Sequence, residues 1–300
     1  MWDYHTVFSL FKMQKSTVSN FFSLVKFSHT LFALPFAMIG YFMGIKFSIH
    51  EFEWSLFLKV ILCMVFARSA AMAFNRYIDR DIDLANTRTA KVREIPRGAI
   101  SPRAALIFVL VNALLFVFTT YFINPICFYL SPIALLVILG YSYTKRFTAL
   151  CHVILGLGLS FAPIGAYLAV VGKFSTLPVL LSIAVLFWVS GFDMIYSLQD
   201  KNFDSKMKLH SIPVSIGAKG SLMLSAIFHL VTATIIIYIT FAANGNYLFW
   251  IGSCIFIALL NYQHLIVKPN DLSKVNVAFF TTNGFASLIF SIFVISSFYF

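Results

Sequence analysis

Nine apolar stretches, each long enough to cross a membrane as a helix, occupy most of this sequence. A helix needs roughly 20 apolar residues to span about 30 Å of hydrocarbon. The stretches lie at residues 28–46, 54–77, 104–122, 126–144, 150–171, 177–198, 220–242, 247–265 and 276–298. Charged residues make up only 11% of the 300-residue chain, too few to cover a soluble protein. The sequence therefore predicts an all-α membrane protein with nine transmembrane helices and excludes a water-soluble enzyme.

Basic residues are distributed unevenly between the loops on the two sides of such a bundle. Of the 22 lysines and arginines, all but Lys46, Lys59 and Lys173 fall before the first stretch or around the ends of the second, fourth, sixth and eighth. Because cytoplasmic loops carry an excess of basic residues, we expect a cytoplasmic N-terminus. The same bias explains the net charge of +11 without a nucleic-acid partner. We expect a cytoplasmic segment at 1–27 and a single nine-helix domain at 28–300, with motif loops at about 75–103 and 193–217.

Seven of the eleven acidic residues fall in two clusters, which four expected helices separate. The clusters consist of Asp79, Asp81, Asp83 and Glu94, and of Asp193, Asp200 and Asp204. An even number of crossings returns the chain to the same face of the membrane. Topology therefore allows the two clusters to meet on the cytoplasmic side.

Helical spacing arranges the first cluster as a row. At about 100° per residue, Asn75, Asp79 and Asp83 share one helix face, and we call them the first row. Asp81 points away from this face and is interpreted as solvated. Arg68 falls near the same face, two turns deeper, where it either snorkels to the interface or meets an anionic group of a substrate.

The second cluster forms a row of its own. Asp193, Asp200 and Asp204, the second row, fall within about 40° of one another on a helix, and Tyr196 lies beside them. An unpaired Asp at the depth of Asp193 costs on the order of 2.5–3.5 kcal/mol, so it requires a cation or a water-filled cavity.

Two facing rows of oxygen ligands with basic residues nearby fit the chemistry of a metal-bound diphosphate. Magnesium is commonly shared between one or two carboxylates and the phosphates of a substrate, and Lys and Arg take the remaining phosphate charge. Departure of the diphosphate from an allylic carbon leaves a carbocation, which aromatic faces stabilise. The alternative interpretation of the two acid clusters is that they are only solvated in cytoplasmic loops. The alternative interpretation of Lys145 and Arg146 is that they serve only to set the orientation of the chain in the membrane. An ion-coupled transporter is a further alternative, although its acids are expected near the bilayer midplane.

The cysteines and histidines point to no other chemistry. Cys63, Cys127, Cys151 and Cys254 are scattered through apolar stretches without a CxxC pair, which excludes a disulfide framework and a thiolate zinc site. The histidines after the N-terminal tail lack metal-ligand spacing and are interpreted as structural or interfacial. They are His29, His50, His152, His210, His229 and His264.

Three motifs in order resemble those of the UbiA superfamily of intramembrane prenyltransferases. Residues 75–83 match its NxxxDxxxD motif and continue through Arg88-Thr89-Ala90 and residues 95–101 as family members do. Residues 193–204 match DxxYxxxDxxxD, and residues 141–148 resemble YxxxKRxT. The resemblance spans roughly residues 20 to 300 and includes the nine helices of the family.

The resemblance implies a helical bundle around a central cavity that opens sideways to lipid, in which Mg²⁺ ionises a polyprenyl diphosphate. The implied ligands of Mg²⁺ and diphosphate are Asn75, Asp79, Asp83, Asp193, Asp200 and Asp204. Asp79, Asp83, Asp200 and Tyr196 are the implied catalytic residues. The residues expected to contact the diphosphate are Asn75 and the basic residues Arg76, Lys145, Arg146 and Lys201. At the position of Arg76, many family members have an Asp instead. Arg68 stands where members that use aromatic acids have an Arg for a carboxylate.

The resemblance to the 4-hydroxybenzoate polyprenyltransferase branch implies an aromatic polyprenyltransferase of respiratory quinone synthesis, either ubiquinone or menaquinone. Its expected partners are a polyprenyl diphosphate, a phenolic aromatic carboxylate and the lipid bilayer. We expect an inner-membrane location with the active site facing the cytoplasm. A dihydroxynaphthoate, the acceptor of the futalosine route to menaquinone, is an alternative, because Arg68 suits both carboxylates. Superfamily enzymes that use haem, chlorophyll-type or lipid-glycerol acceptors are a further alternative.

Overall fold

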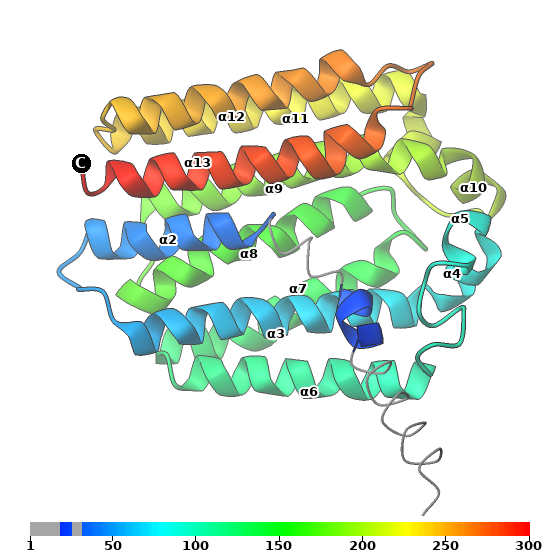
Figure 1. Cartoon of the computed structure of the whole chain (residues 1–300), viewed down its shortest axis with the longest axis horizontal. Helices are drawn as coiled ribbons and strands as arrows, with labels where there is room; N and C mark the ends of the chain where they lie inside the picture. Colours follow the sequence, from blue (N-terminus) through cyan, green and yellow to red (C-terminus); the bar gives the residue numbers. More distant parts are fainter. Residues whose placement is uncertain (1–18, 26–31) are drawn as a thin grey trace, which may run out of the picture.

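The computed structural model describes residues 19–25 and 32–300, and this part of the chain is nearly all helical (Figure 1). Within these described residues, eight helices are long and apolar enough to cross a membrane. They are α3 (Trp54–Ile78), α6 (Pro102–Tyr121), α7 (Pro125–Thr144), α8 (Cys151–Val171), α9 (Thr176–Ser197), α11 (Ile212–Ala242), α12 (Tyr247–Ile266), and the π-helix η3 (Val277–Thr282) continued by α13 (Asn283–Ser297). Eight of the nine predicted spans are thereby confirmed.

The ninth span, predicted at residues 28–46, is described only in part. Its helix α2 (Leu34–Lys46) has 13 apolar residues, which is shorter than a membrane span. Residues 1–18 and 26–31, which hold most of the predicted N-terminal segment together with His29, lie outside the described part of the chain. The ninth helix and the orientation of the N-terminus therefore stay predictions.

Local sequence signals fix where several of the helices begin. Ser101, Asn124 and Asn246 stand just before α6, α7 and α12, and each side chain accepts a backbone N–H from the first turn. Proline follows directly in α6 and α7, where the missing N–H costs no helical hydrogen bond. Asn124 and Asn246 end the short connections that follow α6 and α11 (Ile212–Ala242), whereas Ser101 ends the longer segment that follows α3.

Aromatic residues fill the core between α2, α9, α12 and α13. Phe36, Trp188, Phe256 and Phe290 are fully buried, and the ring centroids of Phe36 and Trp188 lie 5.0 Å apart. Large apolar side chains on the outer faces of the helices, such as Leu136, stay exposed. This distribution suits a bundle surrounded by lipid, because lipid-facing positions need no polar cover.

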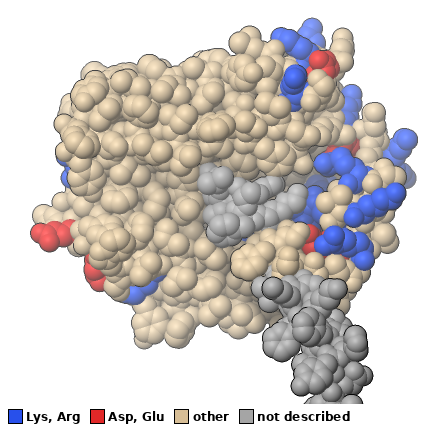
Figure 2. Space-filling model, viewed as in Figure 1, with Lys and Arg blue, Asp and Glu red and all other residues tan. Residues whose placement is uncertain are grey.

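Short helices gather at one end of the bundle, where most of the visible lysines and arginines also lie (Figures 1 and 2). They are α4 (Arg80–Ala85), α5 (Thr87–Ala90), the 3₁₀ turn η2 (Leu198–Asp200) and α10 (Lys201–Lys206). Much of the sequence expected to form motif loops is therefore helical. α3 ends at Ile78, but hydrogen bonds from Asp79 N to Asn75 O and from Asp83 N to Asp79 O keep the helical register across the junction. The first row survives this break.

Candidate active site

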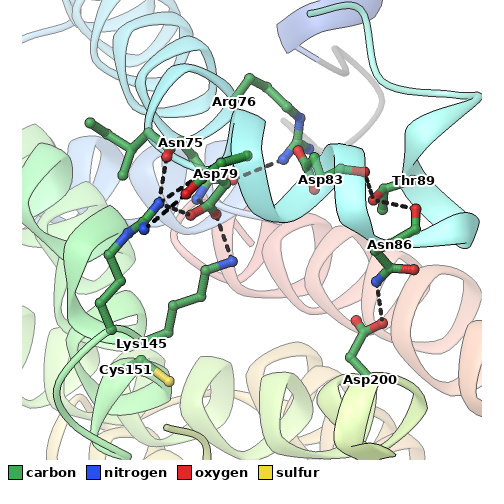
Figure 3. Close-up of polar contacts among 12 residues, drawn as sticks. Asn75, Arg76, Asp79, Asp83, Asn86, Thr89, Lys145, Cys151 and Asp200 are labelled. Atoms are coloured by element: carbon green, nitrogen blue, oxygen red, sulfur yellow. Dashed lines mark hydrogen bonds and ion pairs between the residues drawn. The ribbon is translucent and has the colours of Figure 1, made fainter. Parts of the chain in front are cut away.

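The two acid rows meet in one polar cavity of about 240 Å³. Five aspartates contribute to its lining, namely Asp79, Asp83, Asp193, Asp200 and Asp204. Asn86, just past α4, donates from Nδ2 to Asp200 Oδ1 at 3.3 Å (Figure 3). Arg88 on α5 binds the same carboxylate through Nη2 to Oδ2 at 2.5 Å and Nε to Oδ1 at 3.2 Å. Residues that follow the first row thus hold the second, and the prediction that the rows meet is confirmed.

The two aspartates of the first row are buried and lie close to basic side chains. Asp79 and Asp83 are only 4% and 7% exposed. Asp79 Oδ2 accepts from Asn75 Nδ2 at 2.9 Å and pairs with Lys145 Nζ at 2.8 Å, while Arg76 Nη1 donates to Asn75 Oδ1 at 2.8 Å (Figure 3). Burial raises the pKa of Asp83 above its usual value. In the described part of the chain, Asp79 Oδ1 and Asp83 Oδ2 are buried without a hydrogen-bond partner.

The second of the paired basic residues, Arg146, takes a different place. Its Nη2 donates to the carbonyl oxygen of Ile78 at 2.6 Å and to Asp81 Oδ1 at 3.0 Å, and it lies 3.9 Å from Asp79 Oδ1. Asp81 is exposed, as predicted, but it is not merely solvated, because the hydrogen bond from Arg146 lowers the pKa of Asp81. Lys145 and Arg76 line the polar cavity, whereas Arg146 and Lys201 are not among its described lining residues.

In the second row, Asp193 and Tyr196 have partners of their own. His152 Nδ1 lies 2.7 Å from Asp193 Oδ2, so this histidine has a polar partner that its sequence spacing did not indicate. The Tyr196 ring stacks on Phe279 with centroids 4.1 Å apart, and Arg88 Nη1 donates to its hydroxyl at 3.4 Å. Tyr196 therefore contributes one aromatic face of the site.

An apolar cavity of about 530 Å³ adjoins the polar one. Several residues line both cavities, among them Asn75, Arg76, Arg93, Tyr141, Asp193 and Tyr196. Arg68 lines the apolar cavity alone. Within the described residues, Arg68 Nε, Arg76 Nε and Arg93 Nη1 are buried without hydrogen-bond partners. Buried unpaired N–H groups of guanidinium are costly, so this wall is suited to an anion.

Sequence reasoning assigned no role to Asn86, Arg88 or Arg93, and it interpreted His152 as structural or interfacial. Arg88 lies in the stretch Arg88-Thr89-Ala90 that continues the first motif, and this was the one sequence signal for a role of Arg88 in the site. The other partners become visible only when the chain is folded. Among the described residues, no three Asp, Glu, His or Cys side chains are grouped closely enough to hold a metal by themselves. The carboxylates instead face Lys145, Arg88 and His152.

Comparisons with known proteins agree with the motif resemblance. A model of the UbiA prenyltransferase family matches residues 33–289. A 4-hydroxybenzoate octaprenyltransferase of Xylella fastidiosa (strain M12) is 30% identical over 224 residues, which make up 75% of this chain and 74% of that protein. A protein of the same name from Tolumonas auensis is also 30% identical over 224 residues, covering 75% of this chain and 78% of its own length.

Solved structures give the same result for the fold. The apo structure of a UbiA homologue from Aeropyrum pernix K1 has a TM-score of 0.80 at 29% identity and covers 89% of this chain and 97% of its own. A UbiA homologue from Archaeoglobus fulgidus bound to GPP and Mg²⁺ has a TM-score of 0.72 at 20% identity, over 94% of this chain and all of the other. This chain belongs to the UbiA prenyltransferase family and is a prenyltransferase.

Proposed function

We propose that this protein transfers a prenyl chain from a polyprenyl diphosphate to a phenolic aromatic carboxylate, with 4-hydroxybenzoate as the first candidate. The observation that carries the proposal is the junction of the polar cavity, lined by both acid rows, with the larger apolar cavity. The polar cavity suits a diphosphate, and the apolar cavity suits a prenyl chain and an aromatic ring. The relatives named 4-hydroxybenzoate octaprenyltransferase support this choice of acceptor.

The residues of the polar cavity fit a divalent cation. Buried carboxylate oxygens without a hydrogen-bond partner, at Asp79 and Asp83, are hard ligands of the kind that Mg²⁺ prefers. The proposed ligands of Mg²⁺ and diphosphate are Asn75, Asp79, Asp83, Asp193, Asp200 and Asp204. When bound, Mg²⁺ neutralises charge on the diphosphate and makes it a better leaving group.

Basic side chains would bind the diphosphate that this cavity admits. Lys145 and Arg88 now pair with Asp79 and Asp200, and both line the polar cavity. A diphosphate offers them further anionic oxygens at the same place, so each can hold a phosphate while it stays beside its carboxylate. Arg76 contributes a third cation from the wall shared with the apolar cavity.

The apolar cavity would bind the rest of both substrates. The stacked rings of Tyr196 and Phe279 present aromatic faces, which stabilise a developing allylic cation. Arg68, with its buried unpaired Nε, is the proposed partner of the acceptor carboxylate. Apolar walls exclude water, which would otherwise capture the cation.

We place the enzyme in the inner membrane, with the site facing the cytoplasm, in the synthesis of a respiratory quinone. The basic residues gathered at the end that holds the acid rows support this orientation (Figure 2). Ubiquinone and menaquinone both need a prenylated phenolic ring, and a dihydroxynaphthoate is the alternative acceptor. The position of the acids at one end of the bundle counts against an ion-coupled transporter.

A two-acceptor assay tests this proposal. Purified protein with Mg²⁺ and a polyprenyl diphosphate is offered 4-hydroxybenzoate or a dihydroxynaphthoate, and C-prenylated product is measured by mass spectrometry. We expect product with one of them. EDTA is expected to abolish the reaction and added Mg²⁺ to restore it, since the proposed ligands are hard oxygens. No product with either acceptor, or full activity after chelation, would contradict the proposal.

A further inference from the structure

Three polar side chains from three helices meet inside the apolar core. Asn283 is the first residue of α13, Gln263 lies near the end of α12, Trp188 lies in α9, and all three are fully buried. Trp188 Nε1 donates to Asn283 Oδ1 at 2.9 Å, and Gln263 Nε2 donates to the same oxygen at 2.8 Å. Polar groups are costly in an apolar core unless they are hydrogen-bonded, so their meeting at one amide calls for a reason.

The donor side of the same amide holds the π-helix η3. Asn283 Nδ2 donates to the carbonyl oxygens of Ala278 at 3.0 Å and of Phe279 at 3.1 Å. Thr282 Oγ1 donates to the preceding carbonyl, that of Val277, at 3.1 Å. A π-helix is a rare, wide turn that occurs frequently at functional sites. Side chains therefore stabilise three successive carbonyl groups of this turn.

The chemistry of its partners fixes the orientation of the Asn283 amide. The indole N–H of Trp188 can only donate, so the atom that it meets is Oδ1. The backbone carbonyl groups of η3 can only accept, so the atom that faces them is Nδ2. Both lone pairs and both N–H groups of the amide are thus engaged, and a fully satisfied network of this kind rigidifies its surroundings. The amide ties η3 to α9 and α12.

The π-helix carries an aromatic ring to the boundary of the two cavities. The ring of Phe279 stacks on that of Tyr196 with centroids 4.1 Å apart, and it meets the ring of Phe192 edge-on at 5.3 Å. Among the residues of η3 and α13, which the structure describes in full, Phe279 alone lines the apolar cavity. Tyr196 lines both cavities. The two stacked rings therefore stand where a diphosphate and its prenyl chain would join.

Resting on the proposed function, we infer that Asn283 is a positioning residue, which holds η3 so that the Phe279 ring faces the developing allylic cation. When the bond from the allylic carbon to the diphosphate oxygen breaks, its electron pair leaves with the diphosphate and the positive charge stays on the carbon chain. An aromatic ring attracts a cation that lies over its face, so the placement of the ring decides how much it stabilises the charge. Phe279 is the residue that meets the cation, and Asn283 acts through it.

Single and double variants of the full-length protein test this dependence. Phe279→Leu keeps an apolar side chain but removes the ring, so kcat for prenyl transfer from GPP is expected to fall by about 10- to 30-fold, with the KM for GPP within about twofold of wild type. Asn283→Leu should lower kcat by about 10-fold with the same unchanged KM, because a misplaced group loses most of its effect. The double variant should be no slower than Phe279→Leu, since Asn283 acts through that ring. Losses that multiply would show a general structural role and overturn the inference.

Further variants separate positioning from stability. Gln263→Met/Asn283→Leu replaces both amides by apolar side chains, which avoids an unpaired Gln263 if Asn283→Leu folds poorly, and the same loss of kcat is expected. Phe279→Tyr keeps the ring and should keep most of the activity. Thr240→Val is the matched control, because the Thr240 hydroxyl lies 2.8 Å from that of Ser253 in a buried contact between α11 and α12. It should lower the temperature of thermal unfolding and leave kcat within about twofold of wild type. A loss of kcat in Thr240→Val as large as in Asn283→Leu would contradict the inference.

The outcomes distinguish this inference from the function on which it rests. If wild-type protein prenylates neither acceptor, the proposed function fails and the inference fails with it. If wild-type protein is active and Asp200→Asn is not, the proposed function stands. Transfer at the wild-type rate by Phe279→Leu or by Asn283→Leu then shows that only the inference is wrong.

Discussion

The two acid rows have the same residue type at similar spacing, yet their surroundings differ. In the first row, Asp79 is almost fully buried and faces Lys145, while one oxygen of Asp83 is left without a hydrogen bond. In the second row, Asp200 is 22% exposed and held by Arg88, and Asp193 is held by the imidazole of His152. The partner, more than the spacing, decides what each carboxylate is able to do.

The partners of the two rows differ in kind. Lys145 and Arg88 are basic side chains with several donors, so they can hold a phosphate and a carboxylate together. The imidazole of His152 binds Asp193 through a single ring nitrogen and orients that carboxylate. The comparison therefore separates Asp79 and Asp200, which pair with basic side chains that line the polar cavity, from Asp193, which pairs with a buried imidazole.

The largest effects are expected when either row loses its charge at the proposed diphosphate site. Asp79→Asn and Asp200→Asn should each lower kcat for prenyl transfer by about 10³-fold, because each removes a preorganised charge from the same site. Both rows act on one ligand, so the double variant should be little worse than the worse single one. Initial rates at saturating Mg²⁺ measure this. Multiplying losses would show that the rows work separately, and full turnover of either single variant would refute the shared site.

Next in size are the effects of the two cations, one for each row. Lys145→Met and Arg88→Met should raise the KM for the prenyl diphosphate, since a hydrogen bond to a charged group is worth about 1.5–3 kcal/mol, or roughly 10- to 100-fold. Arg88 is the more exposed of the two, so its loss should cost less than that of Lys145. Steady-state kinetics with both substrates varied give the comparison. A change in the KM of the acceptor alone would place these cations elsewhere.

Most of the fold follows from apolar length alone. The stretch predicted at 54–77 is the helix Trp54–Ile78, and the one at 247–265 is Tyr247–Ile266. The stretch predicted at 220–242 begins earlier, at Ile212, and passes through Gly217, whose φ of 73° lies outside the helical region. That first part carries a serine, a glycine and a lysine, so its helix depends on tertiary packing, which average hydropathy does not record.

The site was predictable as two rows but not as a set of partners. Periodicity places Asp79 and Asp83 together because a helix fixes neighbours four residues apart. Arg88 meets Asp200 across 112 residues, and His152 meets Asp193 across 41. Such contacts depend on how helices pack, and a single sequence carries no local signal for them. The same limit explains why Arg146, adjacent to Lys145, turned out to bind Asp81 and the end of α3.

A smaller effect is expected at the apolar cavity, which lies beyond both rows. Arg68→Gln should raise the KM of a carboxylate acceptor by about 10-fold, with the KM of the prenyl diphosphate unchanged, because one charged hydrogen bond is lost. The carboxamide analogue of the acceptor is the matched control, since it offers no anion to Arg68. Equal losses for the acid and the amide would mean that Arg68 supports the cavity wall instead.

The smallest effect is expected at Asp81, which has the same charge as Asp79 but lies outside the cavity. Asp81→Asn should leave kcat within about twofold of wild type, because an exposed ion pair contributes at most about 1 kcal/mol to stability. The pKa of Asp81 is lowered in the folded protein, so its contribution is present above the unfolded pKa of about 3.9 and is lost as the pH falls through the folded value. Thermal unfolding of the variant and of wild type should therefore differ by a constant small amount from pH 8 to about pH 5 and converge only below about pH 4. A large loss of activity in Asp81→Asn would mean that the number of charges at this end of the bundle, and not their placement in the rows, determines the rate.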